Sequence, residues 1–113
     1  MHEYPITMEI IRLAEKEAKK NNAKSVSKIN LVVGEFSGYL ADSIKLYFDI
    51  HTKGTMCEKA ELTIENVKPK LKCGKCGKLF ERKPFEFNCP SCNGIGEPTE
   101  IGREFYIKSI EVE

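Results

Sequence analysis

The sequence has no tryptophan, only two histidines, and no apolar run that approaches the ~20 residues of a membrane-spanning helix. Its first five residues, MHEYP, lack the basic start and the apolar stretch of a signal peptide. An excess of one charge is missing too, since 18 Lys and Arg face 17 Asp and Glu, for a net charge of +1. The overall charge therefore indicates no nucleic-acid or membrane partner, and we expect a cytoplasmic protein.

The sequence also contains little of the chemistry that enzymes use. It has no glycine-rich phosphate-binding loop and no His-Glu-x-x-His pair, and the one histidine that could partner a serine or cysteine is His51. We interpret His51 as a residue of the protein surface or of the edge of the core. The sequence thus predicts a protein that is not an enzyme.

Two segments have the apolar spacing of amphipathic helices, residues 5–22 and 40–51. In the first, Pro5 suits the first helical position and Asn21–Asn22 mark the end. In the second, one face is expected to carry Leu40, Ile44, Tyr47, Phe48 and His51.

Three segments are predicted to be strands, residues 26–35, 60–67 and 103–113, because they are β-branched or alternate between apolar and polar residues. The alternation shifts at Lys108–Ser109, which predicts a β-bulge. The predicted fold is α/β (α+β), with two helices packed on a three-stranded sheet and an inserted zinc-ribbon lobe that has four cysteine ligands. The expected domains are an α/β domain of residues 1–67 plus 103–113 and a zinc-ribbon domain of residues 68–102.

Four of the five cysteines form two pairs with metal-ligand spacing, Cys73-x-x-Cys76 and Cys89-x-x-Cys92, twelve residues apart. Four thiolates satisfy the tetrahedral preference of Zn(II) and leave no open position, so the predicted zinc is structural. Residues 68–102 have too little apolar material for a core of their own, which favours stabilisation by metal. Cys57 stands apart, and we interpret it as a small buried hydrophobe or a free thiol.

Two alternatives apply to the same lobe. A rubredoxin-like iron site also uses such cysteine pairs, but the second pair is followed by Asn93 and no electron-transfer chemistry is visible. A zinc-ribbon protein can instead bind nucleic acid or a transcription complex through a basic lobe. We favour a solvated basic face around core phenylalanines, and the residues concerned are Lys68, Lys70, Lys72, Lys75, Lys78, Arg82 and Lys83 with Phe80, Phe85 and Phe87.

The N-terminus offers a second set of metal ligands, all of them nitrogen. They are the free amine of Met1, the imidazole of His2, and the backbone amides of His2 and Glu3 once deprotonated. Nitrogen donors in one plane favour Ni(II) or Cu(II) over Zn(II). Cu(II) has the higher intrinsic affinity, so nickel would have to prevail through supply and delivery by partners. By itself, a histidine at position two is more often incidental.

Several motifs together resemble the HypA family, the hydrogenase nickel-incorporation metallochaperones, over nearly the whole chain. Tyr4 and Pro5 depart from the small and apolar residues expected there. The motifs are Met1-His2-Glu3, Gly34-Glu35-Phe36-Ser37-Gly38, Asp42-Ser43-Ile44, Glu58-x-Ala60-x-Leu62-x-Ile64-Glu65, the four cysteines, and Gly102-Arg103-Glu104-Phe105-Tyr106-Ile107 before Ile110-Glu111.

The resemblance implies a nickel metallochaperone that carries Ni(II) and does not catalyse a reaction. Ni(II) would be bound by the Met1 amine, His2 and the backbone amide of Glu3, while the four cysteines would hold a structural Zn(II). Glu3 would also support docking to the GTPase HypB, and Asp42 would lie next to the nickel site. The implied customers are the [NiFe]-hydrogenase large subunit and urease accessory proteins, between which the sequence does not choose.

Overall fold

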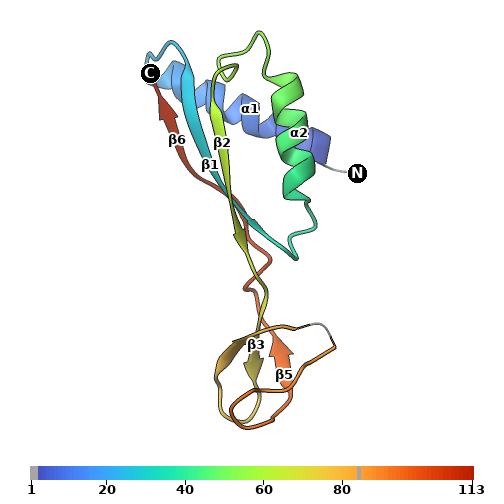
Figure 1. The fold of residues 1–113 in the computed structure, drawn as a ribbon. Coiled ribbons are helices and arrows are strands. Elements are labelled where there is room, and N and C mark those ends of the chain that lie inside the picture. The colour runs from blue at the N-terminus through green and yellow to red at the C-terminus, as the bar shows by residue number, and fades with distance from the viewer. Residues whose placement is uncertain (1–2, 84) are drawn as a thin grey trace.

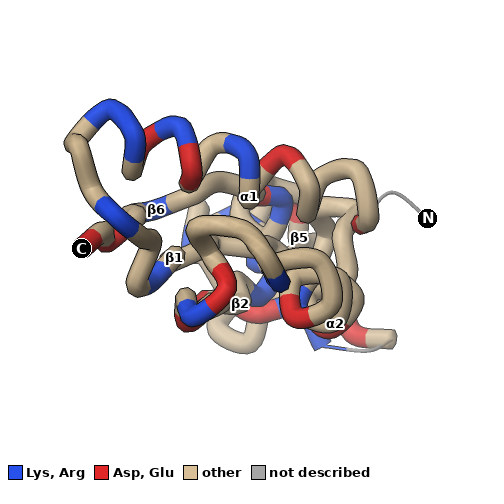
Figure 2. Tube along the Cα trace, turned by 90° about the horizontal axis from the view of Figure 1, so that it is seen from above, with Lys and Arg blue, Asp and Glu red and all other residues tan. Residues whose placement is uncertain are grey.

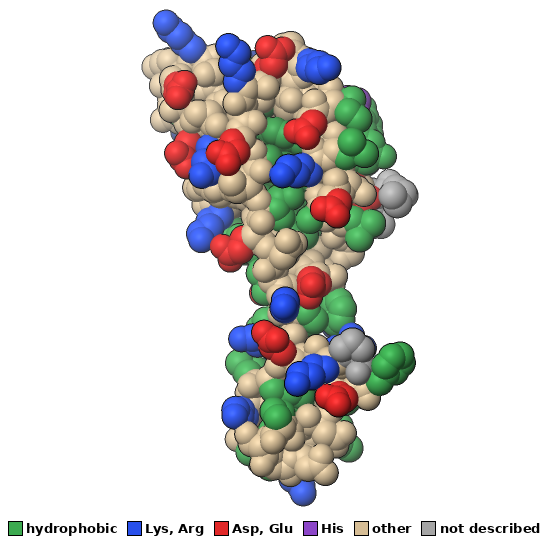
Figure 3. Space-filling view, viewed as in Figure 1, with side chains coloured by type: hydrophobic (Ala, Val, Ile, Leu, Met, Phe, Trp, Pro, Cys, Tyr) green, Lys and Arg blue, Asp and Glu red, His purple; other side chains and the backbone are tan. Residues whose placement is uncertain are grey.

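The computed structural model describes residues 3–83 and 85–113, which form an elongated molecule of 55 × 27 × 16 Å. Figures 1 and 3 show a larger and a smaller lobe joined by a narrow waist. We call residues 3–67 and 103–113 the α/β lobe and residues 68–102 the four-cysteine lobe. The elements are α1 (Glu3–Lys20), β1 (Val26–Gly34), α2 (Ala41–His51), β2 (Glu61–Val67), β3 (Lys70–Cys73), β4 (Leu79–Glu81), β5 (Gly96–Pro98) and β6 (Phe105–Val112).

The α/β lobe contains a three-stranded sheet of order β2-β1-β6. β1 is parallel to β2, with Ile29 opposite Leu62, and antiparallel to β6, with Ile29 opposite Ile110. A parallel pair needs a crossover connection, and α2 supplies it between β1 and β2. The predicted fold class, two helices on a three-stranded sheet with an inserted four-cysteine lobe, is confirmed.

The β-bulge predicted in the last strand is present. Asn30 pairs with Ser109 and the next residue, Leu31, pairs with Ile107, so Lys108 is the extra residue of β6. The bulge explains the shift in the apolar pattern, because one inserted residue moves the following side chains to the other face of the sheet.

Both helices cover the same face of this sheet (Figures 1 and 2). Charged residues of both signs are interspersed along α1 (Figure 2). The core between helices and sheet contains Ile10, Ala14, Ile29, Ile44 and Phe48, each at most 2% exposed. No described helix is both long and apolar enough to cross a membrane.

The helix boundaries differ from the predicted ones by one or two residues. In the structure Glu3 belongs to α1, so Pro5 is its third residue and not its first; proline is tolerated there because the first four N–H groups of a helix have no helical acceptor. Asn22 ends α1 in a left-handed conformation with φ 56°. Leu40 precedes α2 as its N-cap and is 59% exposed, which corrects its expected place on the buried face.

The four-cysteine lobe has a second sheet, of order β4-β3-β5, and a small core of Leu71, Phe80, Cys73 and Cys89. The expectation of core phenylalanines is correct for Phe80 alone. Phe87 is 46% exposed and Phe85 is 96% exposed. The short strands cannot cover three large rings, so two of them remain at the surface.

Glycines allow the chain to cross closely at the waist, which consists of residues 67–70 and 100–104. A Cβ atom on Gly34 would lie 2.1 Å from the carbonyl oxygen of Gly102, and one on Gly102 would lie 2.7 Å from Cα of Pro69. Gly102 also has φ +103°, which an L side chain rarely adopts. The end of β1 therefore packs backbone against backbone on the connection to the other lobe.

Candidate metal centre

The four paired cysteines come from two turns with the same backbone pattern. The N–H of Gly77 donates to the carbonyl of Cys73 at 3.0 Å, and the N–H of Asn93 donates to the carbonyl of Cys89 at 2.9 Å. Gly77 and Asn93 both have positive φ, 74° and 63°. Asn93 thus does in the second turn what a glycine does in the first, since asparagine tolerates the left-handed region better than most residues. Gly74, inside the first turn, has no positive φ.

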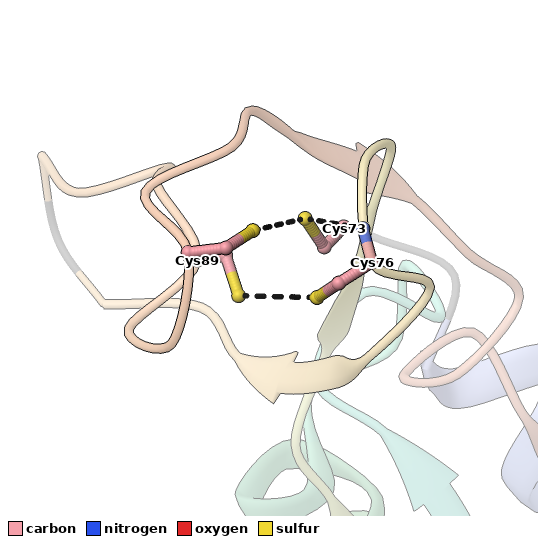
Figure 4. Close-up of side chains that lie close together, drawn as sticks. Cys73, Cys76 and Cys89 are labelled. Carbon is pink, nitrogen blue, oxygen red and sulfur yellow. Dashed lines mark hydrogen bonds between the residues drawn. The ribbon is translucent and has the colours of Figure 1, made fainter.

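The two turns bring the four sulfurs together (Figure 4), all within 4.8 Å of one another. The Sγ–Sγ distance is 3.8 Å between Cys76 and Cys89 and 3.3 Å between Cys73 and Cys92. A zinc ion with four thiolates at ~2.3 Å places its sulfurs about 3.8 Å apart. The four cysteines therefore fit a tetrahedral metal such as Zn(II), with no position left for a further ligand.

Backbone N–H groups favour the thiolate form of two of these cysteines, Cys73 and Cys89. The N–H of Cys76 points at Sγ of Cys73 at 3.4 Å and is the main reason that the pKa of Cys73 is lowered to about 6. The N–H groups of Cys92 and Ser91 likewise lower the pKa of Cys89. Thiolates are the form that binds a metal, so each turn contributes one cysteine that ionises readily. Hydrogen bonding to the neighbouring Cys73 thiol is the largest cause that raises the pKa of Cys92, to about 11.

Packing around the sulfurs requires a glycine at position 94, which the sequence analysis did not single out. A Cβ on Gly94 would lie 2.8 Å from Sγ of Cys73 and 3.4 Å from Sγ of Cys92. The fifth cysteine, Cys57, is fully buried in the core of the α/β lobe. The pKa of the Cys57 thiol is raised to about 11, mainly by burial and to a smaller extent by the charge of Glu15. Cys57 is therefore a protonated core residue.

The N-terminal candidate site is only partly within the described residues. Met1 and His2 lie outside them, and Glu3 begins α1 with its side chain 2% exposed. Its Oε2 accepts a hydrogen bond from the N–H of Leu40 at 3.1 Å. Its Oε1 is buried without a hydrogen-bond partner among the described residues. The Glu3 carboxylate therefore joins the start of α1 to the start of α2, which the sequence did not predict.

Other predicted residues surround this end of the molecule. Asp42 is exposed in the first turn of α2, two residues after Leu40. Tyr4 lies against α2, with its ring centroid 5.7 Å from that of Tyr47 and 5.0 Å from that of His51. His51 is thus a partly exposed member of an aromatic cluster at the edge of the core, as expected.

The fold and the four-cysteine cluster place the chain in a class of small two-lobed metal-handling proteins. The family model described as "Hydrogenase/urease nickel incorporation, metallochaperone, hypA" matches residues 1–112. The chain therefore belongs to the HypA family, whose members are metallochaperones for hydrogenase and urease nickel incorporation. It is a maturation factor and not an enzyme.

Individual relatives are similar to this chain over nearly its full length. The chain is 45% identical to the hydrogenase maturation factor HypA of Caldanaerobacter subterraneus subsp. tengcongensis, covering all of both chains. It is 37% identical to that of Aquifex aeolicus, covering all of this chain and 98% of the other. The solution structure of the nickel metallochaperone HypA from Helicobacter pylori matches 99% of this chain and 97% of its own, with 28% identity and a TM-score of 0.64.

Proposed function

We propose that the chain binds Ni(II) at its N-terminus through the Met1 amine, the His2 imidazole and the backbone amide of Glu3, and passes it on for the maturation of [NiFe]-hydrogenase or urease. The observation that carries the proposal is the position of Glu3. As a residue of the first turn of α1, it has a backbone N–H that needs no acceptor within the helix. A metal can therefore replace the proton of that nitrogen, which is released to water, without breaking a hydrogen bond within the helix.

The Glu3 side chain supports the proposed site by fixing the start of α1. Its carboxylate accepts a hydrogen bond from the N–H of Leu40, which holds Glu3 against the residue before α2. Its second oxygen, Oε1, is buried without a hydrogen-bond partner among the described residues, and in this proposal it interacts with the N-terminal site. Asp42, exposed in the first turn of α2, is the nearby acidic residue that we assign to the surroundings of the site.

Residues 68–102 form, in this proposal, a domain whose Zn(II) is structural and bound by Cys73, Cys76, Cys89 and Cys92. The closed set of four thiolates, with no open position, supports a structural metal over a transferable one. Nickel at the N-terminus has few ligands and is open to a partner, so it can leave by ligand exchange. The partners that we propose are the GTPase HypB, the hydrogenase large subunit and urease accessory proteins, in the cytoplasm.

The direct test is a calorimetric titration of the zinc-loaded protein with Ni(II), beside the His2→Ala variant. We expect one nickel per chain for the parent protein and loss of binding in the variant, with one zinc per chain in both by elemental analysis. His51→Ala is a matched control, because it removes the other histidine and should leave nickel binding intact. Binding that is indifferent to His2 would refute the proposal.

Nickel affinity should also depend on pH in a defined direction. The amine and the imidazole must lose protons before they bind, so affinity should fall as the pH drops below the ~6.5 of free histidine. The same titration at pH 5.5 and pH 7.5 checks this. Equal affinities at the two pH values would exclude this set of ligands.

A further inference from the structure

A cavity of about 300 Å³ lies at the waist, between the two lobes, and none of the described cysteines lines it. Its walls are mostly apolar and come from both lobes. Phe36 belongs to the α/β lobe, in the loop after β1, and the remaining apolar walls belong to the four-cysteine lobe. The apolar side chains are those of Phe36, Pro69, Leu71, Phe87, Pro98 and Ile101.

The polar side of the cavity is cationic. Lys70, Arg82 and Arg103 line it, and no aspartate or glutamate among the described residues does. Arg103 has one ion pair, a long exposed contact of 4.0 Å to Glu100, which is worth little energetically. The cavity therefore offers positive charge beside an apolar wall, a combination that suits a ligand with a carboxylate next to an apolar group.

Arg82 is held in place without using its hydrogen-bonding capacity. Its guanidinium carbon lies 5.4 Å from the ring centroid of Phe36 and 5.2 Å from that of Phe87, so two rings, one from each lobe, contact it. Within the described residues, the guanidinium has no ion pair and no side-chain hydrogen bond. Its N–H groups are free to bind a carboxylate in the two-pronged geometry that arginine favours.

The net charges of the two lobes also favour an acidic ligand at the cavity. Residues 68–102 contain seven Lys and Arg against four Asp and Glu, a net charge of +3, while the rest of the chain has eleven against thirteen, a net charge of −2. An acidic partner is thus attracted to the smaller lobe and to the waist and not to the whole molecule. Figure 3 shows basic side chains around the smaller lobe.

We propose that the waist cavity is a docking site for an acidic segment of a partner protein. A carboxylate of that segment binds Arg82 and Arg103, and a neighbouring apolar side chain packs against Phe36, Leu71 and Phe87. The proposal rests on the proposed function only for the identity of the partner, which would be a protein of nickel delivery. Because the walls come from both lobes, the bound segment would also hold the lobes in one orientation.

A protein segment fits better than a nucleic acid. A cavity of about 300 Å³ is at the small end of ligand pockets and takes one or two side chains, not a nucleotide. Bases need free aromatic faces for stacking. Here Phe36 and Phe87 each already contact the guanidinium of Arg82.

The test uses the full zinc-loaded chain and a peptide probe, acetyl-Glu-Leu-Phe-Asp-amide, followed by NMR chemical shifts that include the side-chain Nε–Hε signal of Arg82. We expect saturable shifts at the waist residues with a dissociation constant on the order of 1 mM or tighter, which is typical of a short flexible peptide. The neutral peptide acetyl-Gln-Leu-Phe-Asn-amide should bind at least tenfold more weakly.

Variants distinguish binding at the cavity from a general electrostatic attraction between peptide and protein. Arg82→Gln and Arg103→Gln should each weaken binding of the acidic peptide about tenfold, whereas Lys20→Gln, which removes the same charge from the exposed end of α1, should not. Equal binding of the two peptides, equal binding by Arg82→Gln and the parent, or tighter binding of a dT12 oligonucleotide would each overturn the proposal. Ni(II) binding should persist in Arg82→Gln and peptide binding in His2→Ala, so failure of one proposal is distinguishable from failure of the other.

Discussion

At the residue scale, a buried carboxylate determines how the N-terminal end of the protein is organised. Glu3 is 2% exposed, a burial that charged side chains reach only when they have a function or a partner. Its Oε2 has such a partner in the N–H of Leu40, and its Oε1 has none among the described residues. The residue thus stabilises the start of α2 through one oxygen and buries the other.

Replacing Glu3 by alanine should therefore destabilise the protein. The change removes the acceptor of the Leu40 N–H, and losing a hydrogen bond to a charged group costs about 2 kcal/mol. The free energy of unfolding, measured by urea denaturation, checks this. The matched control is Glu9→Ala, which breaks an exposed ion pair with Arg12 and should lower the free energy of unfolding by less than the Glu3 change does. Equal effects would mean that the Glu3–Leu40 contact contributes nothing special.

The cysteines should fall into two chemical groups. In the zinc-loaded protein at pH 8, we expect almost no rapid reaction with Ellman's reagent, because metal protects four thiols and Cys57 is buried with a pKa of about 11. Added EDTA should expose the four thiols of the cluster, and guanidinium chloride should be needed for the fifth.

The same raised pKa has a consequence at high pH. The folded state keeps the Cys57 thiol protonated while the unfolded chain ionises it near its ordinary pKa, so this residue favours folding less as the pH rises from about 9 to about 11. Comparing parent and Cys57→Ala across this range isolates the effect. A thiol that reacts in the folded protein at pH 8 would contradict both expectations.

At the scale of elements, the junction between β1 and the waist depends on close backbone packing. The Gly34→Ala change puts a methyl group 2.1 Å from the carbonyl oxygen of Gly102, a backbone atom that cannot move aside cheaply. We expect a loss of about 3 kcal/mol or more in the free energy of unfolding. Gly54→Ala is the control, because its φ of +79° costs about 1 kcal/mol and nothing lies within 4 Å of the added atom. Similar losses for both variants would exclude the close approach as the cause.

At the scale of the whole molecule, the two lobes are stabilised differently. The α/β lobe has a core of helices and sheet, whereas the core of the four-cysteine lobe consists of four residues, two of them cysteines. Residues 70–73, 79–81 and 96–98 form strands of only three or four residues. We therefore expect the smaller lobe, and not the larger one, to depend on a metal for its fold.

Removal of the metal should unfold only the smaller lobe. After EDTA treatment, amide signals of residues 3–67 and 103–113 should keep their dispersion, and those of residues 68–102 should collapse to random-coil positions in an NMR spectrum. The radius of gyration by X-ray scattering should rise above the 17.9 Å of the compact two-lobed form. Loss of dispersion throughout the chain would mean that the lobes fold as one unit.

Much of this protein follows from its sequence, because the signals are local. Apolar periodicity predicted both helices and the three main strands, the shift at Lys108 predicted the bulge, and the spacing of Cys73, Cys76, Cys89 and Cys92 predicted that their sulfurs meet. Each of these patterns depends on residues that are close in sequence. The family resemblance likewise consists of short sequence motifs. The helix ends were less accurate, because capping depends on the conformation of single residues such as Asn22.

The tertiary structure decided which distant residues meet. That Glu3 contacts Leu40, that Arg82 lies between Phe36 and Phe87, and that Gly34 needs to be a glycine because of Gly102 are consequences of how the elements pack. The exposure of Phe85, against the expectation of a core residue, is also of this kind. The sequence shows the hydropathy of each residue and its spacing from others, and so determined the helices, the strands and the cysteine cluster. It does not show which residues become neighbours across the fold, so the contacts between the lobes were decided only by tertiary packing.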